Sequence, residues 1–175
     1  MIHDYEATKP ITTDAFIPGE DMREKTISTL NGLIAICKHG EAGFREAAEN
    51  VERTDLKQLF AEFSGQRSQF AGGLQALVKS LDGDPEESGN LSASLHRAWI
   101  DVKGAFTGKD DAAALSECER GEDSAKKAYK EALATELPDF VRETVQKQYD
   151  SVLVAHDRVK AIRDVAKSTS AKSGK

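Results

Sequence analysis

The sequence predicts an all-α protein built as a four-helix bundle. Apolar residues recur every three to four positions through four long segments, and only four prolines interrupt the 175 residues. Charged residues make up 31% and hydrophobic residues 39%, as in soluble helical proteins with one core. We therefore expect a flexible N-terminal arm over residues 1–20, one bundle over 21–168 and a disordered C-terminal tail over 169–175.

The first two long helices are predicted over about 22–51 and 54–81. The polar run from Glu52 to Asp55 interrupts the apolar period between them. Thr54 is a suitable N-cap for the second helix, and the carboxylate of Asp55 suits its positive first turn. Turn residues over 81–90, LDGDPEESGN, end this helix.

Two further long helices are predicted over about 111–135 and 137–167, with Pro138 accommodated in the first turn of the last one. The second and third long helices are about 28 residues apart, and a short helix is expected over 92–106. A connection of this length lets the third helix start at the end opposite to where the second stops, which is the one-crossover topology of ferritin-like folds. Trp99 on the short helix should then be buried against the bundle.

Each of the four apolar stripes contains one polar residue where an apolar one is expected. Counting from the two tight turns at 1.5 Å per residue places these four residues within roughly 8 Å of one another along the bundle axis. A buried charge without a partner costs several kcal/mol, so the four side chains should satisfy one another. The predicted buried polar layer consists of Glu41, Arg67, Glu122 and Gln148.

Five short motifs resemble a known bacterial family. They are GEAGFREAA at 40–48, RSQF at 67–70, LHRAW at 95–99, CERGED at 118–123 and AHDRV at 155–159. The family is the uncharacterised domain of unknown function 2383, and the resemblance covers about Thr26 to Arg163. It implies a ferritin-like four-helix fold and supplies no established activity.

Two interpretations of the polar layer remain open. Di-metal sites of ferritin-like proteins use single glutamates on two helices and Glu-x-x-His on the other two, but the second helix offers Arg67 and the fourth lacks the motif. A guanidinium between carboxylates would replace the metal with fixed positive charge. The alternative is a weak iron or manganese site, for which carboxylate and imidazole ligands are suitable. Its candidate ligands are Glu41, Glu119, Glu122 and His156.

Several function classes are disfavoured. A net charge of −6 argues against nonspecific binding to nucleic acid or acidic membranes, and no stretch is apolar enough to span a bilayer. Cys37 and Cys118 lie far apart without a CxxC motif, which indicates reduced thiols in the cytoplasm. None of the GxSxG, HExxH, P-loop or GxGxxG motifs occurs, so no catalytic residue is predicted.

We therefore predict a non-enzymatic ferritin-like bundle that acts as a stress-associated or self-associating interaction module. We expect it to form a homo-oligomer, most simply a dimer. No cofactor is expected, and neither nucleic acid nor a membrane is an expected partner. Glycines are numerous within the predicted helices, which suits close approach by the crossover or by a second subunit. The alternative function is an iron- or manganese-binding ferritin-like protein of redox or storage type.

Overall fold

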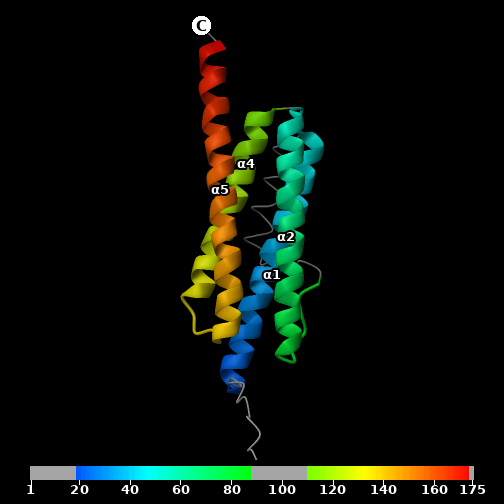
Figure 1. Ribbon diagram of the computed structural model, residues 1–175, viewed down its shortest axis with the longest axis vertical. Coiled ribbons are helices and arrows are strands. Elements are labelled where there is room, and N and C mark those ends of the chain that lie inside the picture. Colours follow the sequence, from blue (N-terminus) through cyan, green and yellow to red (C-terminus); the bar gives the residue numbers. More distant parts are fainter. Residues whose placement is uncertain (1–18, 88–109, 174–175) are drawn as a thin grey trace, which may run out of the picture.

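The computed structural model describes residues 19–87 and 110–173. These ranges form four α-helices: α1 (Glu20–Asn50), α2 (Thr54–Ser80), α4 (Asp111–Leu133) and α5 (Asp139–Ser173). The helices run along one another in an elongated bundle, and the described ranges contain no strand (Figure 1). No helix in them is long and apolar enough to cross a membrane. The predicted all-α four-helix bundle is confirmed.

The four helices are arranged as two antiparallel hairpins, α1–α2 and α4–α5, whose turns lie at opposite ends of the bundle (Figure 1). The backbone N–H groups of Glu52 and Arg53 donate to the carboxylate of Asp111, at 2.9 and 3.3 Å, so α4 begins beside the α1–α2 turn. The other end of α2 lies beside the start of α1, where Arg23 Nη1 donates to the Leu81 carbonyl at 3.1 Å.

α2 therefore ends, and α4 begins, at opposite ends of the bundle. The connection between them includes residues 88–109, which lie outside the described ranges. The predicted short helix over 92–106, and the predicted burial of Trp99, lie outside the described residues.

Local chemistry accounts for the helix ends. Asp110 caps α4, because its side chain accepts hydrogen bonds from the backbone of Ala112 and Ala113. α2 ends where Asp82 adopts a left-handed φ of 55° and Gly83 N–H donates back to the Val78 carbonyl at 3.0 Å. The observed ends of α1, α2 and α4 fall within two residues of the predicted ones.

α5 differs from the prediction at its C-terminal end. It continues to Ser173, six residues past the predicted end at about Lys167 and into the segment expected to be a disordered tail. The hydroxyls of Ser168 and Thr169 donate to the Val165 carbonyl at 2.8 and 3.0 Å. Hydroxyl residues here bond within the helix, and neither glycine nor proline interrupts residues 168–173.

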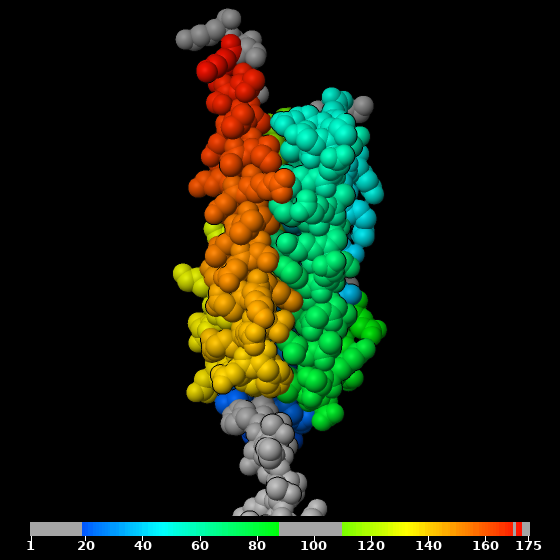
Figure 2. All heavy atoms as spheres, in the orientation of Figure 1, coloured from blue at the N-terminus to red at the C-terminus, as the bar shows by residue number. Residues whose placement is uncertain are grey.

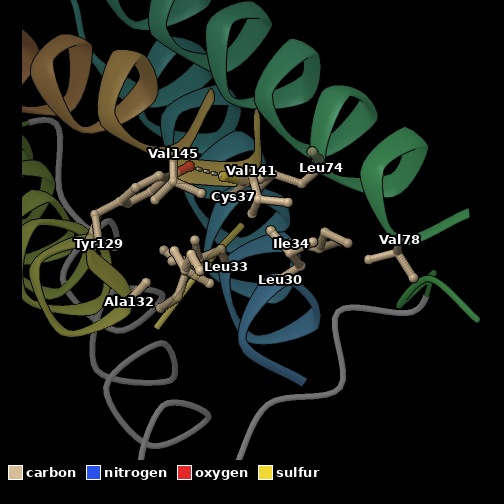
Figure 3. Close-up of a cluster of buried hydrophobic side chains, with 14 of the residues drawn as sticks. Leu30, Leu33, Ile34, Cys37, Leu74, Val78, Tyr129, Ala132, Val141 and Val145 are labelled. Atoms are coloured by element: carbon tan, nitrogen blue, oxygen red, sulfur yellow. Dashed lines mark hydrogen bonds between the residues drawn. The ribbon is translucent and has the colours of Figure 1, made fainter. Parts of the chain in front are cut away.

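The core consists of two apolar clusters, one in each half of the bundle. The first cluster contains Leu30, Cys37, Leu74, Tyr129 and Val145 among its members (Figure 3). The second is built around Phe44, Phe60, Phe63, Leu115 and Val159. The boundary falls between residues 37 and 44 on α1, 63 and 71 on α2, 118 and 125 on α4, and 152 and 155 on α5. Charged residues occupy this boundary.

Candidate functional site

A buried ion pair between Arg67 of α2 and Glu122 of α4 occupies the boundary between the two clusters. Arg67 Nη2 lies 2.5 Å from Glu122 Oε2, and the two side chains are 1% and 2% exposed. Arg67 Nη1 also donates to Gln66 Oε1 at 3.0 Å. Two of the four predicted layer residues are therefore in direct contact, and this contact links the two helical hairpins.

The environment of Arg67 is built to hold a guanidinium. Its Cζ lies 5.9 Å from the ring centroid of Phe44 and 5.5 Å from that of Phe70, so aromatic faces stabilise the cation. Its aliphatic part lies over Gly40 of α1, where an added Cβ would be 3.2 Å from Arg67 Cγ. Arg67 Nε is buried and has no hydrogen-bond partner. The guanidinium is held by one carboxylate, one amide and two rings.

Burial dominates the electrostatics of Glu122. Loss of hydration raises its carboxyl pKa above the usual value of 4.5, although the attraction of Arg67 opposes the shift. Burial therefore disfavours the charged form of Glu122, and the attraction of Arg67 offsets part of this cost. Removal of either partner would leave a buried charge without compensation.

Glu41 lies outside this layer, which corrects the predicted buried set. Its side chain is 29% exposed and pairs with Arg45 on the same helix at 3.6 Å. The inward line of α1 passes from Cys37 through Gly40 to Phe44. Because Gly40 has no side chain, the apolar pattern assigned this inward place to its neighbour Glu41.

Gln148 is buried but belongs to a second polar group, inside the first cluster. Its Oε1 accepts a hydrogen bond from the Tyr129 hydroxyl at 2.7 Å, and its Nε2 donates to the Phe70 carbonyl at 3.3 Å. The Tyr129 hydroxyl also lies 3.1 Å from Cys37 Sγ (Figure 3). On α5 the boundary between the clusters comes after Val152, so Gln148 is about one turn from the level of the ion pair.

The apolar pattern of the sequence does not by itself assign Tyr129 and Cys37 to this polar group. The available signal was a tyrosine on a buried stripe, because a buried hydroxyl requires a partner. Burial raises the pKa of the Cys37 thiol to about 11 and also raises that of Tyr129. Both groups therefore stay protonated near neutral pH.

The remaining predicted metal ligands have other partners. Glu119 is 11% exposed and pairs with Arg163 of α5. The imidazole of His156 is 7% exposed and lies between two carboxylates, with Nε2 3.0 Å from Asp123 and Nδ1 2.9 Å from Asp157. Its hydrogen bond lowers the pKa of Asp157.

These contacts decide how well the residues fit a metal. Each glutamate of the predicted set faces an arginine: Glu41 with Arg45, Glu119 with Arg163 and Glu122 with Arg67. Across residues 19–87 and 110–173, no three His, Cys, Asp or Glu side chains converge as a metal site would require. A cation at Glu122 would have to displace a buried guanidinium. The described residues do not fit the di-metal centre of ferritin-like proteins.

Two solved structures share the fold over most of this chain. One is a bacterioferritin-related protein from Bacteroides fragilis, described as a dodecameric thioferritin, with a TM-score of 0.67 and 16% identity. The match covers 85% of this chain and 90% of that one.

The other is a two-domain protein from Anabaena variabilis with DJ-1/ThiJ/PfpI-like and ferritin-like domains, at a TM-score of 0.66 and 16% identity. It covers 82% of this chain, which spans only 40% of the Anabaena protein.

At this identity the likeness establishes the ferritin-like fold alone. No curated protein matches the chain. The family resemblance is confirmed by a family model that matches residues 25–135, which is more than half of the chain and includes four of the five motifs. The protein therefore belongs to the family described as domain of unknown function 2383.

Proposed function

We propose that this protein is a non-enzymatic, self-associating interaction module in which an arginine takes the mid-bundle place that metal has in ferritin-like proteins. The observation that carries this proposal is the Arg67–Glu122 pair, buried at 1% and 2% exposure. A fixed guanidinium supplies the positive charge that a carboxylate in a bundle core requires. The charge is then permanent and needs no ion from solution.

Displacement of the arginine by a cation would be unfavourable. Arg67 would have to leave two aromatic faces and a buried carboxylate, and its charge would remain inside the bundle. Glu119 and Glu41 are likewise each paired with an arginine. We therefore assign the Arg67–Glu122 pair a structural role, and we expect the protein to act through its surface.

Self-association is supported by the fold neighbour from Bacteroides fragilis, which is described as dodecameric. Exposed Phe140, Val154 and Val165 on α5 also favour it, because such side chains gain by burial against another protein. A dimer is the smallest assembly that would bury them. The proposed compartment is the cytoplasm, where the free thiols of Cys37 and Cys118 would stay reduced.

Metal analysis tests the proposed role of the layer. Protein purified without chelator is incubated with iron(II) or manganese(II), passed over a desalting column and analysed for bound metal. The expected result is far less than one metal per chain, and iron(II) oxidation in air no faster than in buffer. Retention of one metal per chain, lost in both Glu122→Ala and His156→Ala, would overturn the proposal in favour of the iron- or manganese-binding alternative.

A comparison variant makes the metal test sharper. Arg67→Glu removes the guanidinium and adds a carboxylate beside Glu122, which brings α2 closer to the ligand pattern of ferritin-like proteins. This variant should bind more iron or manganese than the wild type, and the metal should raise its melting temperature. Equal metal content in the two proteins would contradict the view that Arg67 excludes the ion.

A further inference from the structure

All of the large apolar side chains exposed in the described ranges lie on one helix. Phe140, Val154 and Val165 of α5 are 46%, 67% and 65% exposed. Their spacings of 14 and 11 residues are close to four and three helical turns, so they project within about 40° of one another around α5. The three side chains are about 21 and 16 Å apart along the helix axis, so they are separate apolar positions on one face of α5. We call Phe140, Val154 and Val165 the α5 stripe.

The α5 stripe lies on the side of α5 that is remote from α4. His156 and Arg163 contact α4, through Asp123 and Glu119. Val154 is two residues before His156, and Val165 is two residues after Arg163. Two residues are a rotation of about 200°, so Val154 lies roughly 160° around the helix from His156, and Val165 lies as far from Arg163. The stripe therefore belongs to the surface that α2 and α5 form side by side, which faces the viewer in Figure 2.

One contact defines the level of α5 against α2. Gln148 Nε2 donates to the Phe70 carbonyl at 3.3 Å and lies 3.6 Å from where a Cβ on Gly73 would be. Arg158 follows Gln148 by ten residues, and Glu62 precedes the Phe70–Gly73 contact by a similar distance along the antiparallel helix. At 1.5 Å per residue, Arg158 and Glu62 therefore lie at about the same level. Both residues are exposed.

The α2 half of this surface is polar. Its exposed residues include Glu62, Gln69, Gly73 and Ala76, of which none is a large apolar residue. On this side Gly73 has no side chain and Ala76 carries only a methyl group. Another helix can therefore approach α2 closely along this side.

We infer that the α2–α5 surface binds a second copy of this chain, with α5 of each protomer packed on α2 of its partner. A two-fold axis parallel to the helices produces this arrangement and keeps every residue at its own level. Arg158 of one protomer then faces the partner's Glu62, and symmetry forms this pair twice. The α5 stripe then runs along the polar α2 half of the partner's surface. This charge complementarity favours a second copy over an unrelated partner.

The inference rests on the self-association proposed above and specifies its surface. Sedimentation velocity on the full chain over a range of concentrations tests it with three proteins: the wild type, Val154→Asp/Val165→Asp, and the control Lys160→Glu. The control changes the net charge by the same amount at an exposed position about 120° around α5 from Val154. Circular dichroism verifies that each variant is folded.

We expect a wild-type dimer whose dissociation constant rises about tenfold for each valine replaced, and a control that associates like the wild type. A charge-reversal series is the second measurement. Glu62→Arg and Arg158→Glu should each weaken the dimer, and the two together in one chain should restore it.

The outcomes separate the two proposals. A dimer that is unaffected by Val154→Asp/Val165→Asp would overturn the assigned surface and leave self-association standing. A wild type that stays monomeric at about 1 mM would overturn self-association itself, because a specific dimer should form well below that concentration. Equal weakening by the Lys160→Glu control, or no restoration by the double charge reversal, would also overturn the assigned surface.

Discussion

The side chain of Arg67 fills the space that Gly40 leaves open on the neighbouring helix. A Cβ on residue 40 would lie 3.2 Å from Arg67 Cγ and 3.4 Å from Cδ. These atoms are in the middle of a side chain whose far end is held by Glu122 at 2.5 Å. Gly40 and Arg67 are thus matched in shape, and neither can change freely.

Gly40→Ala should destabilise the protein although alanine favours helices. Overpacking against Arg67 costs about 1–3 kcal/mol, which exceeds the gain of about 1 kcal/mol in helix propensity. Gly121→Ala is the matched control, because an added Cβ there has no neighbour within 4 Å. Urea unfolding should show a loss for Gly40→Ala and a gain for Gly121→Ala. Higher stability in both variants would mean that the Arg67 side chain can shift away from an added Cβ at little cost.

The ion pair should behave as a coupled unit in a double-mutant cycle. Arg67→Met alone leaves Glu122 buried without a partner and should cost about 3–5 kcal/mol of the free energy of unfolding. With Glu122→Gln also present, the combined loss should be smaller than the sum of the two single losses by about 1–3 kcal/mol. Glu41→Gln, combined with Arg67→Met, serves as the control and should be additive, because Glu41 pairs with Arg45. An additive Arg67–Glu122 cycle would contradict the coupling.

The pH dependence of stability should carry the signature of Glu122. Its carboxyl pKa is raised in the folded state, so the folded state binds a proton more tightly than the unfolded state. The free energy of unfolding of the wild type, relative to Glu122→Gln, should therefore fall as the pH rises from about 4.5 through the folded pKa.

The control for this measurement is Glu143, whose carboxyl pKa is lowered by its hydrogen bond to Lys147. The contribution of Glu143, measured against Glu143→Gln, should change in the opposite direction and be lost as the pH falls. Chemical denaturation between about pH 4 and 8 measures both differences. A stability difference for Glu122 that is flat or rises with pH would show that Arg67 outweighs burial.

Tyr129→Phe should weaken the first cluster. The change removes the hydrogen bond to Gln148 Oε1 and the contact with Cys37 Sγ, and leaves a buried amide oxygen without this donor. The expected loss is about 1–3 kcal/mol. A second change, Gln148→Leu, removes the orphaned amide and should recover part of the loss. Thermal unfolding of the single and double variants checks this, and equal melting temperatures for wild type and Tyr129→Phe would argue against the bond.

The helices were predictable because their apolar period is long and their ends carry turn residues. The pairing of Arg67 with Glu122 could also be predicted, since charged residues on apolar stripes need a partner when they are buried. The position of Glu41 could not be predicted, because the inward place beside it is held by Gly40, and a glycine does not count as an apolar position in the pattern. The partners of Glu119 and His156 depend on how long side chains reach around α4 and α5, and spacing along one helix does not determine this.

The placement of the ion pair has a consequence for how the two hairpins align. Arg67 belongs to the α1–α2 hairpin and Glu122 to the α4–α5 hairpin, and apolar clusters lie on both sides of them. Apolar contacts alone tolerate sliding, because one turn of leucines and valines resembles the next. A slip of one turn, about 5.4 Å, would press each charge against apolar side chains and leave both unpaired. Together with the Gln148–Phe70 contact between the same hairpins, the ion pair therefore favours one axial alignment among several that the apolar pattern alone would permit.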